Sequence, residues 1–518
     1  MVYDKLKYER SIQLFEKWRL PLKSVKKFKI ANETLWFILI FIFSVFLFLN
    51  KITFSDIWID ESVTKALVKY PLKNLMGFLT EDFHPPLYFL GLKWFTFFTG
   101  VSDFTIRLFS VLGTLSTLLL SYFAGQRLFG KKGALYFCLL LISLPMLAFQ
   151  SHNARMYTWA AFSITGVFLY AGLFLQKQAK NDLIWLGLFS LMAAYLHYYS
   201  LIAAFWANVF VLLCLLVKKN KAWRAHVIVS GLVVLLYLPW LLTFLGQTGA
   251  AIKEFWIPEL SLGAIISCYR DPFAMNFGVP ISSIILLIFV YLLTIFSIFK
   301  NRNEKLVLGL ALTIYNLTIL TGIVFSILIK PILFSRYMAA IMTMLMVPPA
   351  IFLINCKSKV IKIFSLVCIL LLGLYTNITA AKFSWGPFRQ TMAQLHSGHP
   401  QIKKIIHATD VTTGPLLDHN EIGNWKHYWI KNENSVAANL TVFKDIIEIP
   451  DLDTALDEGE IFGMIDVENL PRNRENFNLV LSQCRQIQVD RIVDEKTDAG
   501  GVFLIYILEF KGKSAEIE

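Results

Sequence analysis

The first 380 residues alternate long apolar runs with short polar turns. The run at 35–49, LWFILIFIFSVFLFL, contains no charged residue, and extending it back to Ile30 gives the ~20 residues that a membrane-crossing helix needs. Runs of this kind, repeated along the chain, predict a polytopic membrane protein. We expect about eleven transmembrane helices, near 31–50, 104–126, 133–150, 158–176, 183–197, 201–217, 225–243, 280–299, 306–328, 338–355 and 361–379.

Basic clusters in alternate loops give the expected orientation, because Lys and Arg are enriched in short cytoplasmic loops. The arm at 1–30 is polar and basic and has no small-residue cleavage site, so we expect a cytoplasmic N-terminus rather than a signal peptide. The clusters are Arg127/Lys131/Lys132, Lys177/Lys180, Lys218/Lys219/Lys221/Arg224, Lys300/Arg302/Lys305 and Lys357/Lys359/Lys362.

One apolar stretch does not fit this count. If 87–99, LYFLGLKWFTFFT, crossed the membrane, every later basic loop would face outward. The stretch is short, contains Lys93 and follows two prolines. We therefore expect an interfacial helix within a long first external loop, 51–103.

The composition changes after Ala380. Residues 381–518 mix polar and apolar positions, with short β-like runs. We expect a small α/β domain here, on the outer face. The runs are KKIIHATD, DIIEIP, EIFGMID, NLVLSQC and GVFLIYILEF.

Composition supports the membrane prediction and excludes other classes. The chain is 56% apolar and 16% charged, whereas soluble domains average ~45–50% and ~25%. A net charge of +13 would suit a nucleic-acid partner, but the basic residues fall in inter-span loops and form no nucleic-acid motif, so we expect none. The six cysteines have neither disulfide-scaffold nor zinc spacing.

The ionisable residues away from the basic loops gather on the expected outer side. Each has an ordinary explanation by itself, such as a solvated loop pair, a snorkelling arginine or an aromatic belt. Their convergence at one end of the bundle indicates a functional site, because charge near membrane depth is costly. The candidates are Asp60, Glu61, His84, Arg155, Tyr157, His197, Tyr198, Arg336 and Tyr337.

The order of these motifs resembles the GT-C glycosyltransferases. It is most similar to the bacterial family 39 branch, which is related to protein O-mannosyltransferases and lipid A aminoarabinose transferases. The resemblance covers about 30–380, and no single motif is specific alone. After the Asp60–Glu61 pair, the motifs are HPPLY at 84–88, DFTIRLFS at 103–110, ARMYTW at 154–159, LHYYS at 196–200 and SRYM at 335–338.

The resemblance implies an inverting transfer from a polyprenyl-phosphate-linked sugar. The acceptor would be a hydroxyl of a glycolipid, cell-envelope glycan or protein at the outer face of the bacterial cytoplasmic membrane, among membrane lipids. Asp60 matches the proposed general base, and Glu61 its acidic neighbour. The remaining matches are His84 near the donor phosphate, Arg155, Tyr157, Arg336 and Tyr337 as phosphate-binding residues, and His197 and Tyr198 in the substrate pocket.

Two departures leave the substrates open. No inter-span loop is long enough to hold the soluble modules of protein mannosyltransferases, and His84 stands where aminoarabinose transferases have Lys. A divalent metal bridging the phosphate to Glu61 or His84 is compatible with the residues, but no spacing establishes it.

The chemistry suits these residue types. An acceptor hydroxyl needs a base, and the departing phosphate needs the fork of an arginine but no general acid. The alternative is a multi-span transporter or lipid flippase. Transporters place ionisable residues at the midplane of paired halves, whereas here they lie in outer loops.

Overall fold

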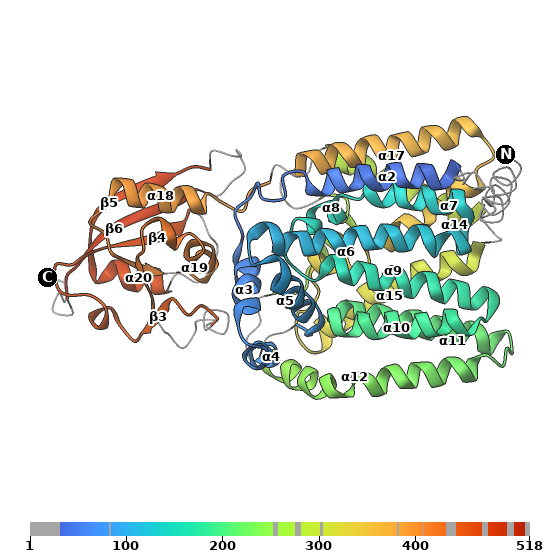
Figure 1. Ribbon diagram of the computed structural model, residues 1–518, viewed down its shortest axis with the longest axis horizontal. Helices are drawn as coiled ribbons and strands as arrows, with labels where there is room; N and C mark the ends of the chain where they lie inside the picture. The colour runs from blue at the N-terminus through green and yellow to red at the C-terminus, as the bar shows by residue number, and fades with distance from the viewer. Residues whose placement is uncertain are drawn as a thin grey trace, which may run out of the picture.

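The computed structural model describes residues 32–81, 84–251, 257–274, 281–300, 304–380, 383–407, 409–430, 442–468, 475–494 and 502–512. The predicted cytoplasmic arm at 1–30 lies outside these ranges. A long bundle of helices occupies one part of the molecule and a smaller sheet domain the other, joined through a layer of short helices (Figure 1).

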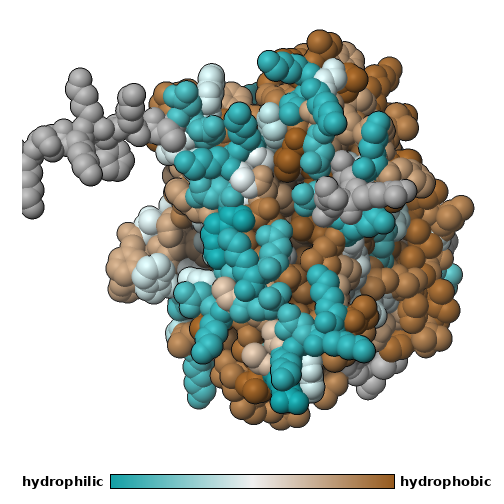
Figure 2. All heavy atoms as spheres, turned by 90° about the vertical axis from the view of Figure 1, so that its right-hand side faces the viewer, coloured by the Kyte–Doolittle hydropathy of each residue, from teal (hydrophilic) through white to brown (hydrophobic). Residues whose placement is uncertain are grey.

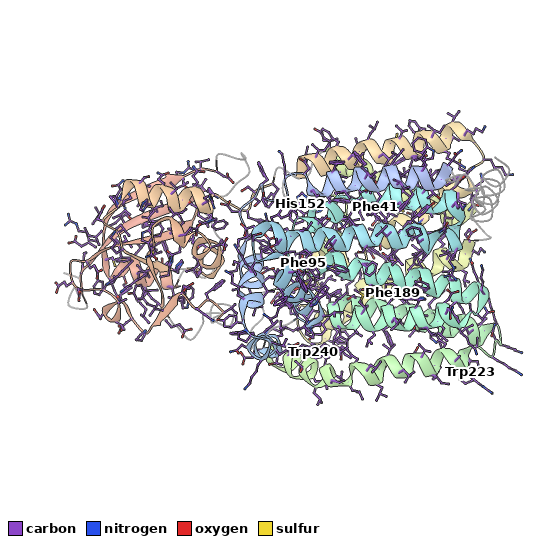
Figure 3. The ribbon with its side chains drawn as sticks, in the orientation of Figure 1. Phe41, Phe95, His152, Phe189, Trp223 and Trp240 are labelled. Carbon is purple, nitrogen blue, oxygen red and sulfur yellow. The ribbon has the colours of Figure 1, made fainter. Side chains whose placement is uncertain are left out.

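The bundle is built from apolar helices whose buried faces form one continuous core. Aromatic side chains lie in or against this core along its length, from Trp223 at one end to Trp240 near the other (Figure 3). Its helices are α2 (Asn32–Leu49), α6 (Asp103–Phe123), α7 (Gly125–Ile142), α8 (Pro145–Ser151), α9 (Tyr157–Lys177), α10 (Lys180–Leu196), α11 (Tyr198–Val217), α12 (Trp223–Ala251), α13 (Leu262–Arg270), α14 (Ile281–Lys300), α15 (Lys305–Leu328), α16 (Val347–Asn355) and α17 (Lys359–Ala380).

The chain is a multi-pass membrane protein. Eight of the described helices, α2, α6, α9, α11, α12, α14, α15 and α17, are long and apolar enough to cross a membrane. The other three predicted spans are helical too, but shorter or broken. Helices α7 and α8 meet at a 67° bend, α10 has 17 residues, and the last begins with the 3₁₀ turns η2 (Ser335–Ala340) and η3 (Met342–Met346) before α16.

The two ends of the bundle differ in polarity. The ends of α6 and α7, α9 and α10, and α11 and α12 that carry or adjoin the basic clusters lie at the end far from the sheet domain (Figure 1). Viewed from that end, hydrophilic residues cover the middle of the surface and hydrophobic ones surround them (Figure 2).

Three short helices cover the opposite end. They are α3 (Ile59–Lys69), α4 (Leu72–Glu81) and α5 (Leu87–Thr99), and they lie between the bundle and the sheet domain (Figure 1). Helix α5 has only 13 residues, too few to cross a bilayer. The charged residue in this apolar helix has a structural role. Lys93 Nζ donates to the carbonyls of Val68 and Tyr70 at 3.0 and 2.6 Å and so caps the last turn of α3.

The C-terminal domain is a mixed α/β sheet of six strands in the order β3-β2-β1-β4-β6-β5. Strands β1 to β4 run parallel to their neighbours among themselves, and β6 is antiparallel to β4 and β5. The elements are β1 (Lys404–His407), β2 (Lys426–Ile430), β3 (Ile446–Ile449), β4 (Ile461–Val467), β5 (Cys484–Ile492), β6 (Phe503–Phe510), α18 (Phe388–Gly398), α19 (Asp410–Leu417) and α20 (Glu475–Ser482).

One of the predicted β-like runs is wrong. NLVLSQC belongs mostly to α20, because Phe477 and Val480, three residues apart, both turn into the core beneath the sheet. Strand β2 and most of β5 were not predicted. Strand β5 is an edge strand with largely exposed side chains, so its apolar pattern is weak.

Candidate active site

The first turn of α3 places two adjacent carboxylates in different environments. Trp58 precedes the helix with an extended backbone, and Asp60 and Glu61 follow in its first turn, where the helix dipole favours negative charge. The side chain of Asp60 is 27% exposed, whereas that of Glu61 is fully buried. The pair therefore cannot share one role.

Glu61 is bound on both oxygens. Arg107 donates from Nε to Oε1 at 2.8 Å and from Nη2 to Oε2 at 2.6 Å, and the backbone N–H of Ala154 donates to Oε1 at 2.8 Å. This geometry joins α3, α6 and the loop before α9. We therefore propose that Glu61, predicted as a catalytic group, positions the site instead, because its carboxylate is fully buried and both oxygens already accept hydrogen bonds.

Arg107 was not among the predicted site residues. Its other N–H groups donate to the carbonyls of Ile52 and Ser55 from Nη1 and of Asp56 from Nη2, at 3.0, 2.8 and 3.2 Å. All five of its donors are thus used, and they hold the segment that leads into α3. The signal was present in DFTIRLFS, where a charge sits in the first turns of a membrane span and needs a partner.

Arg155 lies against the other side of α3. Only 4% of it is exposed, and its Nη1 donates to Thr64 Oγ1 at 3.2 Å. Its Nη2 lies 2.9 Å from His84 Nε2, which must accept because a guanidinium only donates. Among the described residues no carboxylate pairs with Arg155, and its buried Nε has no acceptor. It is therefore a buried cation with spare hydrogen-bonding capacity.

Arg336, in η2, completes the charged group. Its Nη1 forms an ion pair with Asp60 Oδ2 at 3.1 Å. Its guanidinium stacks 4.8 Å from the ring centroid of Trp58, 5.4 Å from that of Phe334 and 6.0 Å from that of Tyr157. Aromatic faces favour a cation, and they hold this one beside the exposed carboxylate.

Rings of the predicted pocket residues pack around the two arginines. The ring of His197 lies 6.4 Å from that of His84, 5.6 Å from that of Tyr157 and 5.1 Å from that of Tyr337. His197 also caps α11, since its Nδ1 accepts from the N–H of Tyr199 at 3.1 Å. The structure therefore brings His84, Tyr157, His197 and Tyr337 together.

Tyr198 does not join this cluster. Its hydroxyl donates to Gln247 Oε1 and accepts from Trp240 Nε1 at 3.3 Å, so it faces α12. Gln247 in turn donates to the carbonyl of Leu79 at 2.9 Å. These contacts do not support the prediction of Tyr198 as a pocket residue, because its hydroxyl is turned toward α12 whereas the ring of the preceding His197 packs against the site.

The C-terminal domain contacts this end of the bundle at several points, three of which involve Trp58, Asp56 and Lys65. Trp385 stacks on Trp58 with 4.3 Å between centroids. Asp56 accepts from the backbone N–H of Arg389, in the first turn of α18, at 2.9 Å. The third contact is Lys65, described next. The partners lie more than 300 residues apart, so the sequence offered no signal for them.

Lys65, one turn beyond Asp60 on α3, binds two carboxylates. Its Nζ lies 2.7 Å from Asp103 Oδ1 and 2.8 Å from Asp418 Oδ2. Burial alone would lower the pKa of Lys65, but Asp418 and Asp103 outweigh it, so the pKa lies above its ordinary value. The helix that carries Asp60 is thus tied to both the bundle and the C-terminal domain.

The residues do not fit a metal held by protein side chains. Both Glu61 oxygens and His84 Nε2, the groups considered for a divalent ion, already accept hydrogen bonds. Within the described ranges, no three His, Cys, Asp or Glu side chains form a group that could hold a metal ion.

No family model matches the sequence, and neither does any curated protein sequence. Solved structures do match. ArnT from Cupriavidus metallidurans bound to undecaprenyl phosphate aligns at a TM-score of 0.58 and 12% identity, and its apo structure at 0.59 and 11%. Each alignment covers 92% of this chain and 98% of the ArnT chain. From bundle to sheet domain, the chain therefore has the same fold as these two ArnT structures.

Proposed function

We propose that the protein is an inverting glycosyltransferase that moves a sugar from a polyprenyl-phosphate donor to a hydroxyl acceptor. The acceptor belongs to a glycolipid, a cell-envelope glycan or a protein at the outer face of the bacterial cytoplasmic membrane. The GT-C fold and a site of charged residues at one end of the bundle support this reading. The ArnT structure with undecaprenyl phosphate supports the class of donor.

Arg155 carries the proposal. A buried guanidinium that pairs with no carboxylate, as holds for Arg155 among the described residues, is destabilising because burial removes its hydration. Its unused Nε and the nearby Arg336 offer an anion both charge and directed donors. A phosphate fits that requirement, since arginine binds phosphate oxygens through paired N–H groups.

Asp60 is the remaining exposed carboxylate of the group. As general base it accepts the proton of the acceptor hydroxyl while the hydroxyl oxygen attacks the anomeric carbon. The bond from that carbon to the donor phosphate breaks on the opposite face, so the configuration inverts. The phosphate leaves as an anion that Arg155 and Arg336 neutralise, so no acid must protonate it, unlike in glycoside hydrolysis.

The aromatic and imidazole groups complete the site. His84 orients Arg155 through the 2.9 Å contact, and Tyr157 and Tyr337 place hydroxyl-bearing rings beside the arginines as donors to phosphate oxygens. His197 supports these rings from the start of α11. The prenyl chain would lie among membrane lipids along the apolar bundle, beside α5.

A transporter or flippase would use charge differently. Ionisable groups on a translocation path lie near the bilayer midplane. The candidate residues here cluster where α3 and the C-terminal domain meet the bundle, at one end (Figure 1). This placement favours a reaction at the membrane surface over the transport of a substrate across the membrane.

The test is Asp60→Asn, which keeps the shape of the side chain. Mass spectrometry of glycolipids, glycans and glycoproteins, with and without the gene, identifies the product first. Loss of a general base should then lower transfer by roughly 10²–10⁴-fold while the protein inserts normally. Asp457→Asn, on an exposed loop of the C-terminal domain, is the control. If Asp60→Asn transfers sugar at the unmodified rate, Asp60 is not the general base. If glycans and glycolipids are the same with and without the gene, the result favours a transporter.

A further inference from the structure

A cleft opens between α3 and the C-terminal domain. Its volume is about 200 Å³, enough for one sugar ring. One wall is α3, and the other is formed by α19 and by the segment 442–445 that leads into β3. The mechanism above does not use it. The lining residues that are partly or fully exposed are Lys65, Ala66, Lys69, Leu417, Asp418, Phe443, Lys444 and Asp445.

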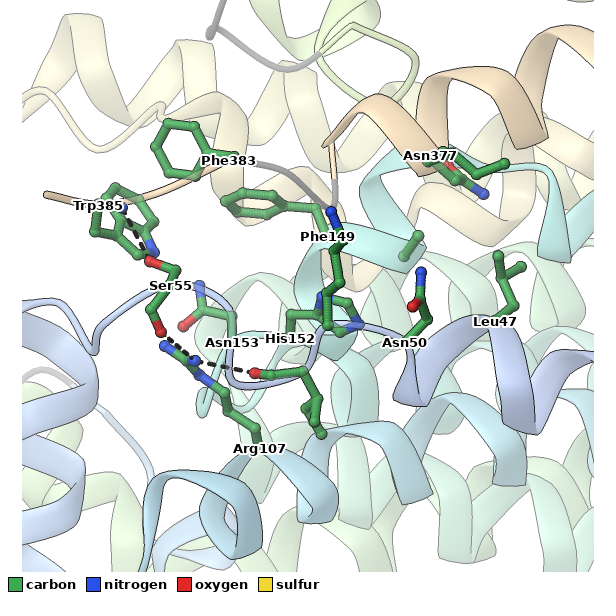
Figure 4. Close-up of a pocket in the computed structure, with 14 residues that line it drawn as sticks. Leu47, Asn50, Ser55, Arg107, Phe149, His152, Asn153, Asn377, Phe383 and Trp385 are labelled. Carbon is green, nitrogen blue, oxygen red and sulfur yellow. Dashed lines mark hydrogen bonds between the residues drawn. The ribbon is translucent and has the colours of Figure 1, made fainter. Parts of the chain in front are cut away.

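A smaller hollow near the ends of α2, α8 and α17 does not compete with the cleft as a ligand site (Figure 4). Its volume is about 50 Å³, room for roughly four water molecules. Within it, the backbone N–H of Trp385 donates to Ser55 Oγ at 2.9 Å, which joins the linker after α17 to the segment before α3. This hollow is therefore part of the junction between the two domains.

The cleft and Asp60 lie on opposite faces of α3. The carboxylate of Asp60 meets Arg336, in η2 of the bundle. The residues of α3 that line the cleft are spaced three and four apart, so they share the face turned to the C-terminal domain. They are Ser62, Lys65, Ala66 and Lys69. A helix with its side chains is about 10–12 Å across, so a ligand in the cleft lies roughly that far from Asp60.

Contacts at both ends of the cleft fix its walls. At one end Gly414 packs directly on Ser62, and a Cβ at position 414 would collide with Ser62 Oγ, so only glycine allows α19 to approach α3 this closely. At the other end the hydroxyl of Tyr70 donates to the carbonyl of Val442 at 2.9 Å. The opening is therefore a preformed feature of the junction.

The charges around the cleft balance. Three lysines and three aspartates surround it, so they add no net charge. A phosphate would meet the carboxylates and a cation would meet the ammonium groups, so neither is favoured. The cleft therefore suits an uncharged ligand. The six residues are Lys65, Lys69, Lys444, Asp418, Asp445 and Asp103, which pairs with Lys65 from outside the cleft.

Three of these side chains can bind a ligand without giving up a partner. Lys69 and Asp445 are exposed, and their side chains form no hydrogen bond or ion pair among the described residues. Lys444 lies 4.5 Å over the ring of Tyr70 and keeps its donors. An ammonium group only donates and a carboxylate only accepts, whereas a hydroxyl does both. Adjacent hydroxyls of one molecule can therefore bond to groups of both kinds.

Apolar surface lies between these polar groups. Ala66 on one wall, and Leu417 and Phe443 on the other, are partly exposed. Apolar walls with a few placed polar groups are typical of small-molecule sites. A sugar ring has the matching surfaces, because its C–H face is apolar and its rim carries hydroxyls.

We propose that the cleft binds an uncharged sugar unit of the acceptor, as a subsite remote from Asp60. The proposal rests on the proposed function, in which Asp60 deprotonates a hydroxyl at the end of the same chain of sugars. Because the two positions are about one helix diameter apart, the acceptor has more than one sugar unit. The shared chemistry is an uncharged oligosaccharide, which a glycolipid or a cell-envelope glycan provides.

The test is photolabelling of the purified full-length protein in nanodiscs, without a donor. The probes are oligosaccharides released by mild acid from cells that lack the gene, tagged with a diazirine at the reducing end and separated on an anion exchanger into uncharged and charged chains. One pool comes from extracted glycolipids and the other from delipidated cell envelopes. Uncharged chains should label peptides that contain 65–70, 417–418 or 442–445, and the pool that labels more strongly identifies the source.

Three variants of the cleft sharpen the result. Ala66→Phe fills it from α3 and should lower labelling about tenfold, equal to ~1.4 kcal/mol. Lys69→Met and Asp445→Asn each remove one charged hydrogen-bonding group from the surface and should also lower labelling about tenfold. The matched controls are Ala225→Phe and Lys218→Met, both exposed at the far end of the bundle, and they should leave labelling unchanged.

Labelling by the charged chains alone, label on other peptides, absence of label, or equal labelling of the cleft variants and the controls overturns the proposal. If Ala66→Phe fails to fold, the two surface variants decide. Labelling needs no transfer, so the subsite and the proposed function fail separately. Loss of transfer in Asp60→Asn without label in the cleft overturns only the subsite, whereas label in the cleft with normal transfer by Asp60→Asn overturns only the base assignment.

Discussion

The carboxylate of Glu61 and the guanidinium of Arg107 form a two-pronged ion pair, at 2.8 and 2.6 Å, inside the protein. Neither side chain has more than 2% of its surface exposed. The same pair holds the N–H of Ala154 and the segment before α3. This ion pair therefore also positions Asp60, the residue before Glu61 in the first turn of α3.

Removal of one member of the pair should be strongly destabilising. Glu61→Gln keeps the shape but leaves Arg107 charged and uncompensated, and we expect a loss of about 3–5 kcal/mol in the free energy of unfolding. Unfolding in mixed detergent micelles measures this loss.

The control is Arg485→Ala, whose side chain is 73% exposed and whose contact with Glu509 is long, at 3.8 Å. It should change stability by less than about 1 kcal/mol. A similar small effect for Glu61→Gln would contradict the positioning role.

Arg336→Ala should weaken donor binding more than acceptor binding. A hydrogen bond to a charged group is worth about 1.5–3 kcal/mol, so we expect affinity for a polyprenyl phosphate to fall by roughly 10- to 150-fold. Titration of the purified variant with the polyprenyl phosphate measures this. Arg224→Ala, exposed at the opposite end, is the control. Equal losses for donor and acceptor would indicate a folding role instead.

The C-terminal domain should lose stability in mild acid. His407 Nε2 donates to His427 Nδ1 at 2.7 Å, and His427 Nε2 donates to Asn420 Oδ1 at 2.9 Å, so these hydrogen bonds require a neutral His427 ring. Burial lowers the pKa of His427 to about 4, and burial together with His427 lowers that of His407 well below its usual value.

In the unfolded chain both histidines titrate near about pH 6.5. Between about 6.5 and about 4 the unfolded state binds protons that the native state does not, so stability falls as the pH decreases. We expect about 1.4 kcal/mol per pH unit for each histidine. Hydrogen exchange of the β1 and β2 amides at pH 7 and pH 5, corrected for intrinsic rates, measures this.

Replacing both His407 and His427 by Gln should flatten the pH profile. His396→Gln, at an exposed position on α18, should leave it unchanged. Protection of β1 and β2 that is independent of pH in the unmodified domain would refute the assignment.

The expected sidedness is tested by cysteine labelling. A membrane-impermeant maleimide should label Thr99→Cys, exposed at the end of α5, in intact cells. It should label Lys131→Cys, exposed in α7 just after the kink at Gly130, only after the membrane is permeabilised. Labelling of Lys131→Cys from outside would reverse the orientation and place Asp60 in the cytoplasm.

Much of the fold was predictable because lipid imposes simple rules. A helix that crosses a bilayer must be apolar over most of its length. Each long apolar run that we predicted to be a span is therefore helical in the structure. Breaks were less predictable. The bend after α7 and the 3₁₀ turns before α16 arise inside runs that are as apolar as the continuous helices, so hydropathy carries no sign of them.

The sequence by itself determined the class of protein, the helices and the set of polar residues at one end. Charged residues are costly inside apolar spans and are therefore concentrated at the ends of the spans and in the loops, where the sequence identifies them. Only the tertiary structure decided their roles. Asp60 and Glu61 are adjacent and chemically alike, yet Arg336 meets the exposed carboxylate and Arg107 the buried one. That difference depends on partners 46 and 276 residues away along the chain, which no local pattern encodes.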